Sequence, residues 1–346
     1  MTSYNNLHRF AQFTTFCTFL LIIAGGLVTS TQSGLSVPDW PTTYGHFMFA
    51  YPLDQMVGGI FYEHSHRLIA STVGFLTLIL AIWLWRREDR RWVRVLGFIA
   101  LATVILQGIL GGLTVQFLLP TPISVSHATL AQTFLSIIAA ISLLTSAWWR
   151  AEQPQPLNDS SSPRLFTLCL LTTMSVFFQL ILGALMRHTQ SGLAVPDFPL
   201  AYGQVFPSLS PEALSEYNRQ LLAQNIRIAA DDPITPTQIV IHMLHRYWAA
   251  LVSFMVIWTS VRLLRVSQHS KRLSRFSYLL IGVLVLQITL GALSVLSQKS
   301  VTMTTAHVAT GAFLLASCVL LTLHVMKLYG VRLLRFYSFS GREVTA

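Results

Sequence analysis

Long apolar stretches separated by short polar segments dominate the pattern of this chain. An apolar run of about 20 residues is long enough to cross a bilayer as an α-helix. Eight runs of roughly that length are present, so the pattern predicts an all-α membrane protein with eight transmembrane helices. They are expected at residues 10–29, 61–85, 95–116, 125–149, 165–186, 238–262, 276–297 and 303–327.

The composition agrees with this fold class. Hydrophobic residues make up 53% of the 346 residues and charged residues only 10%, whereas a soluble domain has about 25% charged residues. The three cysteines, Cys17, Cys169 and Cys318, all fall inside apolar runs, so no disulfide in an outer loop is expected. The first apolar run has full spanning length and no small-residue cleavage site, so we do not expect a cleaved signal peptide.

An internal repeat organises the chain. Residues 31–45, TQSGLSVPDWPTTYG, return as residues 189–203, TQSGLAVPDFPLAYG, with eleven of fifteen positions identical at an offset of 158. The segment EHSHR at 63–67 likewise matches HMLHR at 242–246, and Gln107, Gly111 and His127 match residues 180 positions later. The chain is therefore two copies of one unit, and the second copy has a longer loop.

This repeat predicts the domain organisation. Residues 1–150 form the first four-helix half and residues 165–346 the second, joined by a Pro- and Ser-rich linker at 151–164. Each half has an even number of helices, so the two bundles are expected to be a parallel repeat about the membrane normal. Within the long second loop at 204–237, the segment Ser210-Pro211-Glu212 is typical of a helix start and predicts a short amphipathic helix.

The distribution of Lys and Arg predicts the orientation. Seventeen of these residues fall on the side that holds the connection 86–94, and four fall on the side of the repeated loop. Cytoplasmic connections carry the excess of positive charge, so both termini are expected in the cytoplasm and the repeated loop outside. The net charge of +10 is mostly this signal. It points to the lipid bilayer as a partner and not to nucleic acid.

Four histidines are the strongest candidates for chemistry. His66, His127, His245 and His307 each lie about one turn into an even-numbered helix, so each half should hold two imidazoles at matched depth. Such pairs on facing helices are suitable axial ligands for haem iron, whereas zinc would require a third or fourth ligand. The alternative is that each imidazole only bonds a neighbouring backbone carbonyl.

One position separates the two halves chemically. Glu63 lies three residues before His66, and its counterpart in the second copy is His242. A carboxylate there can accept a proton or stabilise positive charge, so the first half is expected to be the reactive one; alternatively, Glu63 only pairs with Arg67. His242 and His245 share a helix face, and either could be the ligand, although His245 aligns with His66. Arg67 and Arg246 would bind haem propionates or support the site.

These motifs resemble the haem A synthase family. The resemblance rests on TQSGLxVPDxP, on ExxHR at 63–67, on HxxHR at 242–246, and on the late His127 and His307, and it covers all eight predicted helices. It implies oxidation of a methyl group of haem O to a formyl group, which makes haem A. By that resemblance, Glu63 is catalytic, His66 and His127 bind the substrate haem, and His245 and His307 bind a haem b cofactor.

The resemblance also implies a cellular context. Many bacterial members carry a cysteine pair in the outer loops, which this chain lacks, so it resembles the branch without those cysteines. A bacterial inner membrane is expected, with haem sites near the periplasmic side. Haem O synthase would supply the substrate, an unidentified carrier would handle electrons, and oxidase assembly factors and a second copy of the chain are further expected partners. The competing hypotheses are a di-haem b-type electron-transfer protein and a transporter built from two repeats.

Overall fold

The structure is a computed structural model that describes residues 2–151, 162–226, 233–266 and 271–329. Within these ranges, eight helices are long and apolar enough to cross a membrane, which confirms the predicted all-α membrane fold. They are α1 (Thr2–Ser30), α2 (Gly58–Arg87), α3 (Arg91–Gln116), α4 (Thr121–Thr145), α6 (Ser162–His188), α8 (Pro236–Val266), α9 (Lys271–Leu296) and α10 (Val301–Leu328).

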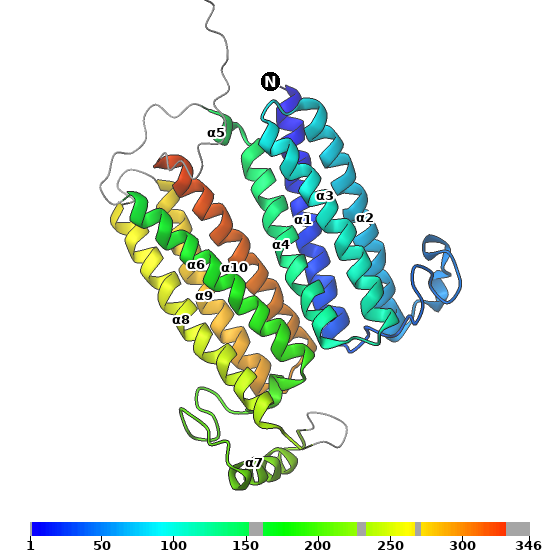
Figure 1. Ribbon diagram of the computed structural model, residues 1–346, viewed down its shortest axis with the longest axis vertical. Helices are drawn as coiled ribbons and strands as arrows, with labels where there is room; N and C mark the ends of the chain where they lie inside the picture. The colour runs from blue at the N-terminus through cyan, green and yellow to red at the C-terminus, as the bar shows by residue number, and fades with distance from the viewer. Residues whose placement is uncertain (1, 152–161, 227–232, 267–270, 330–346) are drawn as a thin grey trace, which may run out of the picture.

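The helices form two bundles that lie side by side (Figure 1). Helices α1, α2, α3 and α4 contact one another in cyclic order, so α2 and α4 face each other diagonally across the first bundle. Helices α6, α8, α9 and α10 repeat that order in the second bundle. Each bundle has its own apolar core, around Leu80 and Ile138 in the first and around Val256 and Leu315 in the second.

The bundles meet through α1 and α4 on one side and α6 and α10 on the other. Ile22, Leu135 and Ala312 form an apolar cluster at this interface. By the repeat, α6 corresponds to α1 and α10 corresponds to α4. The contact of α1 with α10 therefore has a counterpart in the contact of α6 with α4, which fits the expected twofold arrangement.

Polar contacts join the bundles at both ends of this interface. At the end with the repeated loops, the Ser30 hydroxyl accepts hydrogen bonds from Arg187 Nη2 and Thr305 Oγ1, both at 3.0 Å. At the opposite end, Lys327 Nζ of α10 donates to the carbonyl oxygens of Trp148, at 2.6 Å, and Ala151, at 3.0 Å. The two halves are thus held together near both surfaces of the bilayer.

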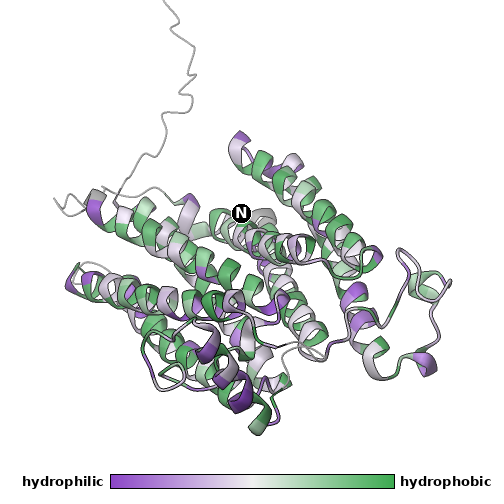
Figure 2. Ribbon diagram, turned by 60° about the horizontal axis from the view of Figure 1, so that its bottom comes forward, coloured by the Kyte–Doolittle hydropathy of each residue, from purple (hydrophilic) through white to green (hydrophobic). Residues whose placement is uncertain are grey.

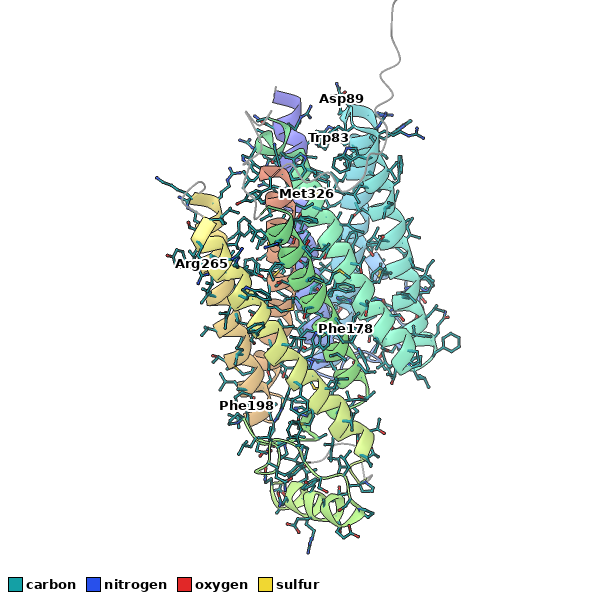
Figure 3. The ribbon with its side chains drawn as sticks, turned by 60° about the vertical axis from the view of Figure 1, so that its left-hand side comes forward. Trp83, Asp89, Phe178, Phe198, Arg265 and Met326 are labelled. Carbon is teal, nitrogen blue, oxygen red and sulfur yellow. The ribbon has the colours of Figure 1, made fainter. Side chains whose placement is uncertain are left out.

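Apolar residues cover the outward faces of the long helices, and polar residues gather toward their ends and in the loops (Figure 2). Figure 3 shows Asp89 at one end of the molecule and Phe198 near the other, which separates the charged connection from the outer loops. This separation is what a bilayer requires, because no water is available in its core to solvate charged side chains.

The helix expected at 125–149 begins and ends four residues earlier than predicted. Helix α4 ends at Thr145, and Ser146 begins a separate turn, α5 (Ala147–Arg150), by accepting a hydrogen bond from Trp149 N at 3.1 Å. A serine hydroxyl that bonds the backbone competes with a continuous helix. Of the predicted linker at 151–164, residues 162–164 belong to α6, and residues 152–161 lie outside the described residues.

The short helix expected in the second outer loop is present as α7 (Pro211–Ala223). Ser210 caps it, since its hydroxyl accepts a hydrogen bond from Ala213 N at 3.2 Å. The buried face of α7 carries Tyr217 and Leu221, which pack against Ile239 and Met243 of α8. This part of the molecule covers the outer end of the second bundle only (Figure 1).

Candidate functional site

Two arginines fasten the repeated loops to the helices that carry the candidate histidines. Arg67 of α2 donates to the carbonyl oxygens of Val37, Asp39 and Thr42 at 2.9, 2.7 and 3.1 Å. Arg246 of α8 donates to the three equivalent carbonyls, those of Val195, Asp197 and Leu200, at 3.0, 2.7 and 3.0 Å. Both arginines therefore hold the outer loops, and the propionate-binding or supporting role at a haem site stays a prediction for both.

An aspartate in each loop fixes the turn that the repeat preserves. Asp39 accepts hydrogen bonds from Tyr44 N and Gly45 N at 2.7 and 2.9 Å, and from Thr42 Oγ1 at 2.5 Å. Asp197 accepts the equivalent bonds from the backbone nitrogens of Tyr202 and Gly203. The glycines have φ of +76° and +75°, a region in which only glycine avoids a steric penalty. The identical Asp and Gly of the motif are thus explained by the folding of the loop.

The pKa of the Asp39 carboxyl follows from this turn. Burial raises its pKa, but the hydrogen bonds from Gly45, Thr42 and Tyr44 outweigh burial and hold the pKa below its usual value. Asp39 is therefore ionised at neutral pH and accepts all three hydrogen bonds as a carboxylate.

Glu63 and His242 occupy the same place beneath the two loops. The Glu63 side chain is buried, and its Oε2 accepts a hydrogen bond from Val37 N at 2.8 Å, while Oε1 pairs with Arg67 Nη2 at 2.7 Å. His242 is also buried; its Nδ1 donates to Ser191 O and its Nε2 accepts from Arg246 Nε, both at 3.0 Å. His245, and not His242, has its imidazole near that of His307 on the opposed helix, so His245 is the better candidate ligand of the two.

The structure brings the candidate histidines together in twos. His66 and His127 project from the diagonally opposed α2 and α4, near enough for their imidazoles to interact electrostatically, and His245 and His307 do the same from α8 and α10. In the described parts of the chain, no three His, Cys, Asp or Glu side chains gather as a metal-ion site. The arrangement consists of two separate imidazole pairs.

A glycine on the preceding spanning helix contacts each imidazole, which our reading of the sequence missed. A Cβ atom on Gly25, Gly111 or Gly183 would lie 3.2 Å from the Cε1 atom of His66, His127 or His245, and one on Gly291 would lie 2.9 Å from that of His307. These distances are shorter than ordinary van der Waals contact, so a side chain at any of the four positions would require the ring to move. The recurrence of Gln-x-x-x-Gly at 107–111, 179–183 and 287–291 is the signal that could have identified these contacts.

The histidines of the first bundle fit a haem. The Nδ1 atoms of His66 and His127 are buried without a hydrogen-bond partner among the described residues, which suits rings that coordinate a ligand in place of a protein group. The glycine contacts hold each ring at one depth, and imidazole is a common haem-iron ligand. When bound, a haem would supply reversible one-electron chemistry at its iron.

Eight spanning helices in two bundles, each with an imidazole pair beneath a fastened outer loop, define a multi-pass helical membrane protein with a paired-histidine site in each bundle. The profile of the family described as "Cytochrome oxidase assembly protein" matches residues 8–319. This chain therefore belongs to that family.

Relatives with assigned names are similar over most of the chain. A protein of Geobacillus kaustophilus named "Heme A synthase" is 27% identical over 310 residues, which cover 87% of this chain and 86% of the relative. A protein of Shewanella oneidensis with the same name is 25% identical over 317 residues, covering 87% and 91%. A third, from Halalkalibacterium halodurans, is 32% identical over 212 residues, covering 60% and 68%.

Proposed function

We propose that this chain is a haem A synthase, an oxidoreductase that converts a methyl group of haem O to a formyl group. The observation that carries the proposal is the pair of imidazoles in each bundle, set against glycines at matched depth. Membership of the cytochrome oxidase assembly family and the names of its relatives support the same activity.

The two bundles would divide the work. His66 and His127 would hold the substrate haem O in the first bundle, and His245 and His307 would hold a haem b cofactor in the second. The cofactor would supply one-electron transfer between the substrate site and an electron carrier. The residues of this chain would fix the depth and orientation of both haems and keep water out of the bundle interior.

Glu63 is the proposed catalytic residue. Its ion pair with Arg67 and its hydrogen bond from Val37 N hold the carboxylate on the face of α2 that also carries His66. There it would accept a proton from the reacting methyl-derived carbon or its hydroxyl group. In the second bundle His242 occupies that place with both nitrogens engaged, which suits a site that only transfers electrons.

The proposed setting is a bacterial inner membrane, with both termini cytoplasmic and the haem sites near the periplasmic side. The excess of Lys and Arg on the side opposite the repeated loops supports this orientation. Haem O synthase would supply the substrate, an electron carrier would complete the oxidation, and factors of oxidase assembly would receive the product.

Pigment analysis tests the proposal. The full chain is expressed with haem O synthase and purified, and its haems are extracted and identified by mass. We expect haem b together with haem O and haem A in the wild type, and loss of haem A with retention of haem b in His66→Ala. Purified protein without haem would contradict the proposal and favour the transporter hypothesis, and haem b alone in both bundles would favour the electron-transfer protein.

A further inference from the structure

The glycine contact occurs at all four imidazoles, but a second support occurs at only three of them. One turn before the glycine, the preceding spanning helix carries Gln107 opposite His127, Gln179 opposite His245, and Gln287 opposite His307. The position equivalent to Gln179 in the first half, four residues before Gly25, is Leu21. His66 is therefore the one candidate ligand of the four for which the preceding helix carries leucine at this position, where the others have glutamine.

The glutamines contact their histidines directly. Gln107 Nε2 donates to the backbone carbonyl of His127 at 3.0 Å, and Gln179 Nε2 donates to that of His245 at 3.0 Å. Gln179 Nε2 also lies 3.1 Å from both ring nitrogens of His245. Gln287 Nε2 lies 3.5 Å from His307 Nε2, and His307 Nδ1 donates to the backbone carbonyl of Gln287 at 3.2 Å.

Each glutamine also has an unused acceptor. The Oε1 atoms of Gln107, Gln179 and Gln287 are all buried without a hydrogen-bond partner among the described residues. A buried amide oxygen without a partner is destabilising, and it occurs at the same position three times. At His127 and His245 the ring N–H could satisfy it, because a ring that binds iron through one nitrogen carries a proton on the other. At His307 the Nδ1–H already donates to the backbone carbonyl of Gln287, so there the support comes from that carbonyl.

Such a hydrogen bond strengthens an axial ligand. It fixes the orientation of the ring and raises the basicity of the coordinating nitrogen, and loss of an outer partner typically weakens metal binding by about 10- to 100-fold. A glutamine amide at 107 or 179 can present Oε1 to the ring by turning, which exchanges its hydrogen bond to the histidine backbone carbonyl for one from the ring N–H. Leu21 has no polar atom, so it can offer no such hydrogen bond to His66.

We propose that Gln107, Gln179 and Gln287 are positioning residues that hold His127, His245 and His307 as permanent axial ligands, and that Leu21 leaves His66 as the releasable one. This inference rests on the proposed function. A cofactor haem stays bound through many turnovers and is held by two supported histidines. A substrate haem must enter and its product must leave, and the first bundle holds it by one supported and one unsupported histidine.

Haem transfer from the full-length protein tests this proposal. The protein, loaded by expression with haem O synthase, is mixed in detergent with excess apomyoglobin, and loss of haem O or A and of haem b is followed by their distinct absorbance. For the wild type we expect haem O or A to leave at least about tenfold faster than haem b. Leu21→Gln should slow that loss by about tenfold and leave haem b transfer unchanged.

Two further variants keep the result interpretable. Leu20→Gln places the same amide one residue away on an exposed position of α1 and should exchange like the wild type. Gln179→Leu, which leaves the first bundle untouched, should speed haem b loss by about tenfold and increase the high-spin ferric signal of that haem in electron paramagnetic resonance. This spectroscopic readout does not depend on catalysis.

The outcomes separate this inference from the function beneath it. Equal loss of both haem types from the wild type, or unchanged exchange in both Leu21→Gln and Gln179→Leu, would overturn the inference while leaving haem A synthesis intact. A wild-type protein that binds no haem O or haem A would instead overturn the proposed function.

Discussion

The two bundles share one framework and differ at three places. Both fasten the same outer loop by an arginine to three carbonyls, and both set an imidazole pair against glycines. They differ at Glu63 against His242, at Leu21 against Gln179, and in the added helix α7 over the second bundle. The shared features explain how each bundle could hold a haem. The differences indicate why only the haem in the first bundle would be oxidised and released.

The largest expected effect separates the bundles by their chemistry. Glu63→Gln should lower haem A formation by about 10²- to 10⁴-fold, because an amide cannot accept the proton that the carboxylate accepts. The measurement is haem A formed per bound haem O, by extraction and mass analysis. His242→Gln, the matching change in the second bundle, should lower haem A formation far less than Glu63→Gln does.

Loop position must be checked in the same experiment, since Glu63 also bonds Val37 N and Arg67. Unchanged protection of the first outer loop from protease would assign the loss to chemistry. Full haem A formation by Glu63→Gln would remove the proposed role of this residue and favour the electron-transfer protein.

The next effect tests the feature that the bundles share. Gly111→Ala and Gly291→Ala place a Cβ atom 3.2 and 2.9 Å from the imidazoles of His127 and His307, so each ring must shift from its position. Haem retention in the affected bundle should fall by about 10- to 100-fold, measured by absorbance after detergent dialysis. Gly108→Ala and Gly282→Ala are matched controls because a Cβ there meets nothing within 4 Å; equal loss in these would show a general helix effect.

A smaller effect should be confined to the second bundle. Tyr217 of α7 is buried and stacks on Tyr202 with ring centroids 3.7 Å apart. Tyr217→Ala should destabilise the packing of α7 by about 3 kcal/mol and expose the second outer loop to protease. Leu222→Ala, at an exposed position of α7, should have little effect. Increased cleavage of the first outer loop as well would show that the two loops are not independent.

The smallest effect is the pH dependence of the first loop. The folded pKa of Asp39 lies below its unfolded value, so its stabilisation is fully present above about pH 4 and is lost as pH falls through the folded pKa. Asp39→Asn should weaken the loop by about 1 kcal/mol and remove that acid transition. Fluorescence of the adjacent Trp40 measures this acid transition of the loop. If Asp39→Asn leaves the transition unchanged, another titrating group causes it.

Much of this architecture could be predicted from the sequence. The length of an apolar run determines where a chain can cross a bilayer, so all eight spans were predicted. The helix-start signal at Ser210-Pro211-Glu212 predicted the amphipathic α7. Repeat alignment also identified the four histidines. The Ser146 break in α4 was missed because a hydroxyl bonding the backbone leaves no trace in hydropathy.

Contacts between helices were harder to predict. Three glycines of α3 cannot be told apart in the sequence: Gly108, Gly111 and Gly112. In the structure, Gly111 contacts the His127 imidazole, and a Cβ on Gly112 would lie 2.5 Å from the Trp40 ring. Gly108 faces open space. Rotation of each helix about its axis decides which neighbour a glycine meets, and neighbouring positions in one run do not specify that rotation. The loop carbonyls that receive Arg67 could not be predicted either, because backbone acceptors have no sequence signature.

The polar contacts at both ends of the bundle interface have a mechanical consequence. Ser30 joins α1 to α6 and α10 near one surface, and Lys327 joins α10 to the turn α5, which follows α4, near the other. The two bundles cannot tilt relative to each other without breaking the hydrogen bonds at one of the two ends. Alternating access by rocking is therefore disfavoured for this molecule, and whatever passes in or out of a bundle must do so through local movement of side chains and loops while the paired framework stays still.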